Sequence, residues 1–496
     1  MLAKYISLAI YFIILIIIGV IASRRVKGIK DYYVGGKSMG YWVVAFSARA
    51  TGESGWLLLG LTGLGAMVGY SAFWVVVGEV LGVAIAWFVM AKPFKALSDQ
   101  YDSITIPDYL SSRFNSQTGS IRKIAATALS VFVMIYVSAQ IFATGEAFTD
   151  FLNMDFMSGA ILGFIIVLVY SSAGGFVAVA WSDLFQGLVM LAGLVLLPIV
   201  AWSYLPEGIS LNAILEAQNP SLTDTWGEGG FNLNNLFTIL SFSLIGLGFL
   251  GSPQIFVRFM SIKDENEINK GRWVAIAFTI ITDSAAVLTG ILGRALIGGQ
   301  GGADIELVLG ESCESVLPML VNKVMPSILI GIYIAAVLSA IMSTIDSLLV
   351  VASSAITRDW YQKIYNPEMS DEALAKYSKV LTIAIALIAL ALAVGVKKFA
   401  PEGNIFWFAI FGWSGLAATF CPTMIMSLFW DKFNEKGAIA AMIVGFACVP
   451  LFKFVINELP HVGPYFTKLD VLAPSFLISF LVGIVVANMT HKKYST

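Results

Sequence analysis

Long apolar stretches alternate with short polar segments along almost the whole chain. A helix needs about 20 predominantly apolar residues to cross a bilayer, and stretches of that length recur from end to end. This pattern predicts thirteen membrane-spanning helices and leaves no room for a large soluble domain. The predicted spans are residues 5–24, 41–68, 71–94, 124–149, 156–173, 180–204, 234–257, 273–297, 321–355, 377–396, 403–430, 436–457 and 471–491.

Composition supports an integral membrane protein. Of the 496 residues, 58% are hydrophobic and 12% are charged, whereas soluble domains average about 25% charged residues. The cluster Arg24, Arg25 and Lys27 follows the first span instead of preceding it. We therefore interpret that span as a retained helix and not as a cleaved signal sequence.

Basic residues are distributed unequally between the connections. Lys and Arg concentrate on the cytoplasmic side of membrane proteins, and they fall in alternate connections if the N-terminus lies outside. The long connection 205–233 carries several acids and no Lys or Arg, and only Lys397 and Lys398 clearly break the rule. The distribution predicts a multi-pass protein of the cell (inner) membrane with its N-terminus outside and its C-terminus in the cytoplasm.

Two spans carry helix-breaking residues at their centres, in residues 47–56 (SARATGESGW) and 246–253 (GLGFLGSP). Gly and Pro at this density disfavour a continuous helix. Counting from the second span, these are the first and sixth of ten helices, which predicts two inverted repeats around a site at the membrane midplane. The alternative is that the glycines only allow close helix packing. The predicted single transporter domain comprises an extra N-terminal helix (5–24), the repeats 41–204 and 234–430, and two C-terminal helices (436–491).

A carboxylate and several hydroxyls interrupt the apolar span 321–355. Asp346 and Ser347 lie three and four residues after Ser343, so both share a helix face with it, and Thr344 lies beside them. A charged side chain at bilayer depth costs ~2.5 kcal/mol or more and usually faces a cavity, a partner or an ion. Hydroxyls alone could bond to their own helix carbonyls, but that alternative leaves Asp346 unexplained. Because oxygen ligands suit hard cations, the segment predicts a cation site.

Other intramembrane charges are candidates for the same region. Asp183 opens the sixth span, where it serves either the helix dipole or a cation. Arg49 and Glu53 stand at i and i+4 and are expected to pair, although Glu53 could instead reach a cation or an ammonium group of a substrate. Glu79 is a further pocket candidate. Aromatic residues that either line a pocket or only pack in the membrane are Trp56, Tyr136, Phe249 and Trp413.

The chain shows no pattern typical of catalysis. It has no P-loop, zinc motif, nucleophile elbow or dinucleotide fingerprint, and its two histidines lie near span ends. The three cysteines have neither metal spacing nor a pairing pattern, so we expect free thiols. We predict a protein that is not an enzyme, with no catalytic residue. We also expect no nucleic-acid partner and see no sign of an obligatory protein partner.

A series of short motifs follows along the chain: GGKSMG (35–40), SGWLL (54–58), IPDYL (106–110), GGF (174–176), WSD (181–183), GSP (251–253), VRFM (257–260), MST (342–344) and SSAIT (353–357). This series resembles the sodium:solute symporter family, and most of all its sodium/proline symporters. The resemblance covers nearly the whole chain, and the order and spacing of the motifs make it specific. It implies an all-α leucine-transporter-type fold with a five-plus-five inverted repeat, one extra N-terminal helix and two extra C-terminal helices.

The resemblance also implies a set of site residues and Na⁺ as the coupling ion. The first sodium site would use backbone oxygens of Ala50, Glu53 and Ala340 with the hydroxyls of Ser343 and Thr344. Some relatives have a second sodium site, so one or two ions per cycle are expected. The second site would correspond here to Asp183, Ser343, Asp346 and Ser347. The solute pocket would consist of Ser54, Gly55, Trp56, Tyr136, Ile245, Phe249 and Trp413.

The identity of the solute is less closely defined. Proline symporters carry Asp, Trp and Tyr where this chain has Gly52, Ile245 and Phe249, and they share its Trp56 and Tyr136. Overall similarity predicts sodium-driven import of proline or a related amino acid by alternating access. The alternatives are a sodium symporter for a monocarboxylate, pantothenate or sugar, a membrane sensor, and a passive channel. Only a few residues follow the last span in this sequence, so we expect a transporter and not a sensor with a cytoplasmic output module.

Overall fold

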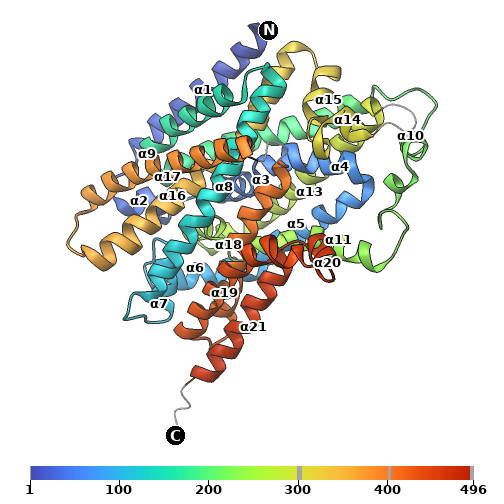
Figure 1. The fold of residues 1–496 in the computed structure, drawn as a ribbon. Coiled ribbons are helices and arrows are strands. Elements are labelled where there is room, and N and C mark those ends of the chain that lie inside the picture. Colours follow the sequence, from blue (N-terminus) through green and yellow to red (C-terminus); the bar gives the residue numbers. More distant parts are fainter. Residues whose placement is uncertain (1, 299–303, 400–403, 492–496) are drawn as a thin grey trace.

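The computed structural model describes residues 2–298, 304–399 and 404–491. Within these ranges the secondary structure is helical, and the only β-type pairing is an isolated bridge between Met39 and Ile262. Eleven of the described helical stretches are long and apolar enough to cross a membrane. The helices pack into one body, with the two chain ends on opposite sides (Figure 1).

Most predicted spans coincide with a single helix. Two predicted starts are clearly wrong. Helix α13 begins at Glu265 and not at residue 273. Helix α16 begins at Ser327 and not at residue 321, because Pro326 cannot continue a helix from the preceding segment. The one-helix spans are α1 (Leu2–Ser23), α8 (Ser120–Leu152), α13 (Glu265–Ile297), α16 (Ser327–Ser354), α17 (Asp371–Phe399), α18 (Ile405–Phe429), α19 (Glu435–Phe454) and α21 (Leu472–Thr490). The predicted start of the eleventh span, residue 403, lies outside the described residues.

The two predicted helix breaks are present. In the first, α3 (Tyr41–Gly55) ends at a turn in which Ser54 has φ +52° and ψ −171°, and the chain continues as η2 (Trp56–Leu61) and α4 (Thr62–Val68). In the second, α11 (Leu233–Leu244) and η6 (Ile245–Leu250) are separated from α12 (Pro253–Ser261) by Gly251, with φ +156°. Both breaks therefore fall where glycine is dense in the sequence.

Glycines also divide two longer helical stretches. Gly175, with φ +53°, interrupts α9 (Phe156–Trp202) between the predicted spans 156–173 and 180–204. Gly69, with φ +62°, separates α4 from the next span, which consists of η3 (Gly69–Ala72), α5 (Phe73–Ile85), η4 (Ala86–Met90) and α6 (Ala91–Gln100). Left-handed backbone of this kind favours glycine. The eleven long apolar stretches give the thirteen predicted spans when Tyr41–Gln100 is counted as two and the shorter apolar helix Phe156–Val169 is added.

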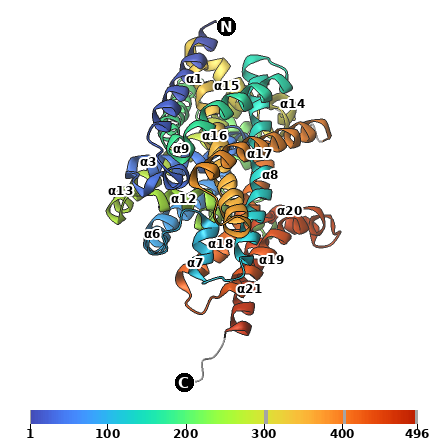
Figure 2. The same ribbon diagram turned by 90° about the vertical axis from the view of Figure 1, so that its left-hand side faces the viewer.

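Helix α16 lies in the interior of the bundle. Every residue from 333 to 354 is buried, and the helix packs against α1, α3, α8, α9 and α17. Figure 2 shows it surrounded by these elements, whereas α19 and α21 form a pair beside α18 at the end that carries the C-terminus. Helix α16 continues directly into η8 (Ala355–Tyr365). Short helices occupy the connections: α2 (Ile29–Val34), η1 (Gly35–Lys37), α7 (Ile106–Arg113), α10 (Leu211–Gln218), η5 (Pro220–Thr223), α14 (Ile305–Leu309), η7 (Glu311–Cys313), α15 (Val316–Val324), η9 (Ile456–Glu458) and α20 (Gly463–Leu469).

Candidate sodium and solute site

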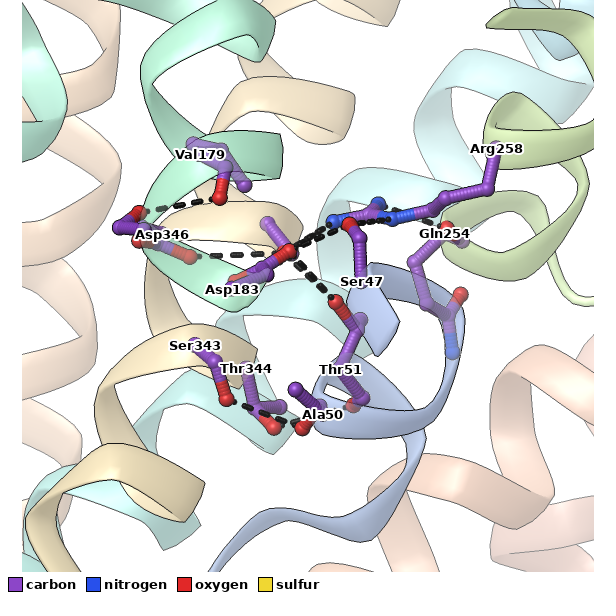
Figure 3. A network of polar contacts seen from close by, with 12 residues as sticks. Ser47, Ala50, Thr51, Val179, Asp183, Gln254, Arg258, Ser343, Thr344 and Asp346 are labelled. Carbon is purple, nitrogen blue, oxygen red and sulfur yellow. Dashed lines mark hydrogen bonds and ion pairs between the residues drawn. The ribbon is translucent and has the colours of Figure 1, made fainter. Parts of the chain in front are cut away.

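The middle of α16 lies directly against the broken end of α3. Ser343 Oγ donates a hydrogen bond to the Ala50 carbonyl at 2.9 Å, and Thr344 Oγ1 donates to the Thr51 carbonyl at 3.0 Å. Both hydroxyls also reach the Ala340 carbonyl, at 3.1 and 3.2 Å. These oxygen atoms are fully buried and come from segments 293 residues apart in sequence (Figure 3). Hydroxyl and carbonyl oxygens thus converge in the membrane interior.

The break in α3 makes one of these carbonyls available. In a continuous helix the Thr51 carbonyl would accept the N–H of Gly55, but here that N–H donates to Gln140 Oε1 at 2.8 Å. The side chain of Trp56 also turns back, and its Nε1 donates to the Gly52 carbonyl at 3.1 Å. The Thr51 carbonyl is therefore free to accept from α16. Sequence reasoning did not single out Thr51, because its availability depends on a turn that only the fold reveals.

Glu53, which the resemblance places among the sodium ligands, has other contacts in this structure. Its carbonyl accepts the N–H of Trp56, and its side chain forms an ion pair with Arg49. The structure brings together Ala50, Ala340 and the two hydroxyls of α16, with Thr51 as an additional member. The role of Glu53 as a sodium ligand stays a prediction.

A second polar network adjoins the first on the side of α9 and α12. Asp183 Oδ2 accepts hydrogen bonds from Ser47 Oγ at 2.5 Å and from Thr51 Oγ1 at 3.4 Å. Arg258 Nη2 lies 3.1 Å from the same carboxylate oxygen and also donates to Ser347 Oγ. All these side chains are buried. Arg258 therefore links α12 to α3, α9 and α16 (Figure 3).

This network contains three of the four residues predicted for a second sodium site, namely Asp183, Asp346 and Ser347, whereas Ser343 contacts the carbonyls of Ala50 and Ala340 instead. Ser347 lies 2.8 Å from Thr51 Oγ1 and 3.4 Å from Asp346 Oδ1, so α16 and α9 bring the predicted ligands together. The structure adds Arg258, which the sequence analysis did not single out as a site residue. The guanidinium supplies a buried positive charge at Asp183. The only signal in the sequence was its position just beyond the predicted span 234–257.

The residues predicted for the solute pocket surround the two helix breaks. Tyr136 OH donates to Ser54 Oγ at 3.3 Å, and Trp413 Nε1 donates to the Ile245 carbonyl at 3.0 Å. The Trp413 ring lies 6.4 Å from that of Tyr136 and 5.0 Å from that of Phe249, centre to centre. Every one of these side chains is buried. The predicted aromatic wall is therefore assembled, in a closed arrangement.

Four charged side chains form a cluster beside this wall. Arg49 and Glu53 are paired, as predicted, and Glu79 Oε2 of α5 lies 3.5 Å from Arg49 Nη2. Asp283 of α13, which sequence reasoning missed, approaches Glu53. Its signal was an isolated acid within the predicted span 273–297. The guanidinium of Arg49 stacks on Phe249, 4.6 Å from the ring centre, so the cluster and the aromatic wall are contiguous.

The three cysteines are unpaired and buried, as expected. Cys421 Sγ lies 3.4 Å from the Gly248 carbonyl and helps to pack η6. Cys313 lies in the connection η7, where burial raises the pKa of its thiol to about 11. Because the thiolate is the reactive form, Cys313 is expected to be inert at neutral pH.

Comparisons with known proteins extend over most of the chain. Residues 32–445 match the model of the sodium:solute symporter family. The osmoregulated proline transporter OpuE of Bacillus subtilis is 33% identical over 488 residues, which cover 98% of this chain and 95% of that protein. The high-affinity proline transporter PutP of the same organism is 34% identical, with 88% and 89% covered. A sodium/proline symporter of Staphylococcus aureus is 32% identical, with 98% and 93% covered.

Solved structures share the fold. A Na⁺-coupled sialic acid symporter in a substrate-bound outward-open state matches with a TM-score of 0.78, at 18% identity and 98% coverage of both chains. MhsT in complex with L-phenylalanine matches with a TM-score of 0.51, at 15% identity, with 89% of this chain and 98% of that chain covered. At these identities the likeness concerns the fold alone. The predicted leucine-transporter-type fold of a multi-pass membrane protein is thereby confirmed.

Proposed function

The chain belongs to the sodium:solute symporter family, and from this premise we propose that it couples Na⁺ entry to the import of proline or a related amino acid. The observation that carries the proposal is the contact between α3 and α16. Ser343 and Thr344 there donate to the carbonyls of Ala50 and Thr51. The relatives named as proline transporters support proline as the first solute to test.

Sodium would take the place of these two hydrogen bonds. Each hydroxyl can rotate so that its lone pair, and no longer its proton, faces the carbonyl, and hard cations favour such neutral oxygen ligands. Ala50, Thr51, Ala340, Ser343 and Thr344 would then hold the ion between α3 and α16. The ion would fix the broken helix next to the solute pocket.

A second ion at Asp183, Asp346 and Ser347 has less support. Arg258 already provides a cation at Asp183, where its Nη2 contacts both the carboxylate and Ser347. Two positive charges in so small a buried volume would repel each other strongly. We therefore propose that one Na⁺ accompanies each solute while Arg258 remains in this position.

Transport would proceed by alternating access between the two predicted repeats, 41–204 and 234–430. Sodium binding would favour the state in which the broken helices complete the pocket. The two repeats of the loaded protein would then move against each other, so that the pocket opens to the other side of the membrane. The distribution of Lys and Arg supports a cell-membrane protein with its N-terminus outside and its C-terminus in the cytoplasm. The solute would enter from the outside.

The energy available from one ion is sufficient for concentrative uptake. A potential of ~100 mV contributes about 2.3 kcal/mol per charge, and a tenfold sodium gradient adds about 1.4 kcal/mol. The sum, about 3.7 kcal/mol, corresponds to accumulation of several hundredfold.

Uptake by the purified protein in liposomes tests this proposal. We expect radiolabelled proline to accumulate when an inward Na⁺ gradient is imposed and to stay at equilibrium when choline replaces Na⁺. A passive channel would instead give sodium-independent flux without accumulation. Unlabelled amino acids, monocarboxylates and sugars added as competitors would separate the proposed solute class from the alternatives. Sodium-independent uptake would contradict the proposal.

A further inference from the structure

The cluster of Arg49, Glu53, Glu79 and Asp283 contains polar atoms that the protein itself does not satisfy. All four side chains are at most 1% exposed. Of the three guanidinium nitrogens of Arg49, only Nη2 has a partner, while Nε and Nη1 have none in the described structure. Glu79 Oε1 likewise accepts no hydrogen bond there. Since buried donors and acceptors are almost always paired, both kinds of group require a partner that the protein does not supply.

The unpartnered nitrogens of Arg49 lie beside the predicted solute pocket. Its guanidinium lies over the Phe249 ring, which in turn packs at a tilt against Trp413. A Cβ atom added at Gly52 would lie 2.9 Å from the Phe249 ring and 3.8 Å from Arg49 Nη1. The absence of a side chain at Gly52 therefore leaves the space in which Arg49 meets the aromatic wall.

Glu79 is held against the second helix break. A Cβ atom added at Gly78 would lie 2.0 Å from the Ser243 carbonyl, and one at Gly82 would lie 2.1 Å from the Gly246 carbonyl. These two close approaches press α5 onto the junction of α11 and η6, on both sides of Glu79. The carboxylate is thus positioned by backbone packing beside the segment that contributes Ile245 and Phe249 to the pocket.

We propose that this cluster binds the charged groups of a zwitterionic amino acid, with Arg49 receiving the carboxylate and Glu79 the ammonium group. A guanidinium N–H group forms a strong, charge-assisted hydrogen bond with a carboxylate, and Nε and Nη1 are the two donors that Arg49 has free. The ion pair with Glu53 keeps Nη2 occupied and so positions the guanidinium. This inference rests on the proposed function and narrows its solute class.

The balance of charge makes the ammonium group essential. Three carboxyl groups surround one guanidinium, so a solute that brought only a carboxylate would add negative charge to a buried acidic region. A monocarboxylate would also leave Glu79 unpartnered, and a sugar would neutralise neither group. A zwitterion satisfies donor and acceptor together.

Analogue discrimination tests the assignment. The probes are proline, prolinamide, which lacks the carboxylate, and cyclopentanecarboxylate, which lacks the amine, each competing with radiolabelled proline for sodium-dependent uptake. We expect both analogues to need at least about tenfold higher concentrations than proline in the wild type, because each leaves a buried polar group unpaired. Arg49→Gln should reduce the preference for proline over prolinamide, and Glu79→Gln the preference for proline over cyclopentanecarboxylate.

The controls separate recognition from folding. Glu216→Gln, which changes an exposed acid in the 205–233 connection, should keep wild-type discrimination. Variants that fail to transport are compared by sodium-dependent proline binding in detergent, with the same analogues as competitors. The inference is overturned if the wild type accepts cyclopentanecarboxylate as well as proline. It is also overturned if both variants weaken all three probes equally. Absence of any sodium-dependent proline uptake or binding in the wild type would instead remove the proposed function, and the inference with it.

Discussion

Two arginines buried in the membrane interior, Arg258 and Arg49, differ in how completely the protein satisfies them. All three guanidinium nitrogens of Arg258 have hydrogen-bond acceptors, supplied by Ser47, the Gln254 carbonyl, Asp183 and Ser347. Arg49 has a partner for one nitrogen only. Both side chains are about equally buried, so burial alone does not explain the difference.

The difference indicates two kinds of intramembrane charge. Arg258 joins four helices, and its contacts are complete without a ligand, as expected of a group that holds the closed arrangement together. Arg49 lies in an acidic cluster, where its unpartnered N–H groups are close to an unpartnered oxygen of Glu79, as expected of a group that binds a solute. The candidate sodium site adjoins both arginines: Ala50 and Thr51 follow Arg49 directly on α3, and the Thr51 hydroxyl contacts Asp183, the partner of Arg258.

Removal of the Arg258 charge should have the largest effect on stability. Arg258→Gln leaves Asp183 buried without its cation, and breaking such a pair costs about 3–5 kcal/mol. We expect a clear loss of thermal stability in detergent, measured by the unfolding of purified protein. The double variant Arg258→Gln/Asp183→Asn should recover part of the loss. Unchanged unfolding of the single variant would remove the distinction between the two arginines.

The sodium site should respond to the loss of one hydroxyl chiefly by a change in ion affinity, beside a loss of about 1 kcal/mol in stability from the missing hydrogen bond. Ser343→Ala removes one proposed ligand, so we expect the Na⁺ concentration for half-maximal uptake to rise by about tenfold, equivalent to about 1.4 kcal/mol. Thr344→Ala should behave similarly. The measurement is the sodium dependence of proline uptake at constant ionic strength. If neither variant shifts it, the site does not lie between α3 and α16.

Thr51 separates the two contributions, because its carbonyl faces the sodium site and its hydroxyl faces Asp183 and Ser347. Thr51→Val keeps the carbonyl and removes the hydroxyl. We expect a loss of about 1 kcal/mol in the free energy of unfolding with a smaller change in sodium dependence than Ser343→Ala produces. A larger change in sodium dependence would mean that the side chain, and not the backbone, binds the ion.

The exposed ion pair between Lys30 and Asp102, 2.7 Å apart, provides the smallest expected effect. Lys30→Ala should change the free energy of unfolding by at most about 0.5 kcal/mol, because solvent screens such pairs. The hydrogen bond from Lys30 lowers the pKa of Asp102. The small stabilisation should therefore persist at neutral pH and disappear as the pH falls through that lowered pKa. A loss as large as that of Arg258→Gln would show that burial is not what distinguishes these pairs.

The sequence predicted the elements better than the contacts between them. The spans and both breaks followed from apolar length and from the density of Gly and Pro. The starts of α13 and α16 were misplaced: α13 begins eight residues before the predicted span, and Pro326 separates α16 from the preceding segment. The pairing of Arg49 with Glu53 was predictable because both lie one turn apart on one helix.

Contacts between distant elements were not predictable from one sequence. Arg258 directly follows a predicted span, so its position suggested a basic residue at the cytoplasmic surface. Its burial depends on how α12 packs against α3 and α9. Asp283 was an isolated acid with no neighbour in sequence to suggest a partner. The carbonyl of Thr51 became a candidate ligand only through the turn at Ser54, which transfers the Gly55 N–H to Gln140.

Direct binding of radioactive ²²Na⁺ to the purified protein tests the central claim, that oxygens of α3 and α16 hold the coupling ion. We predict saturable binding to the wild type and at least about tenfold weaker binding to the double variant Ser343→Ala/Thr344→Ala, with Glu216→Gln unchanged. Equal sodium affinity of the wild type and the double variant would contradict the account.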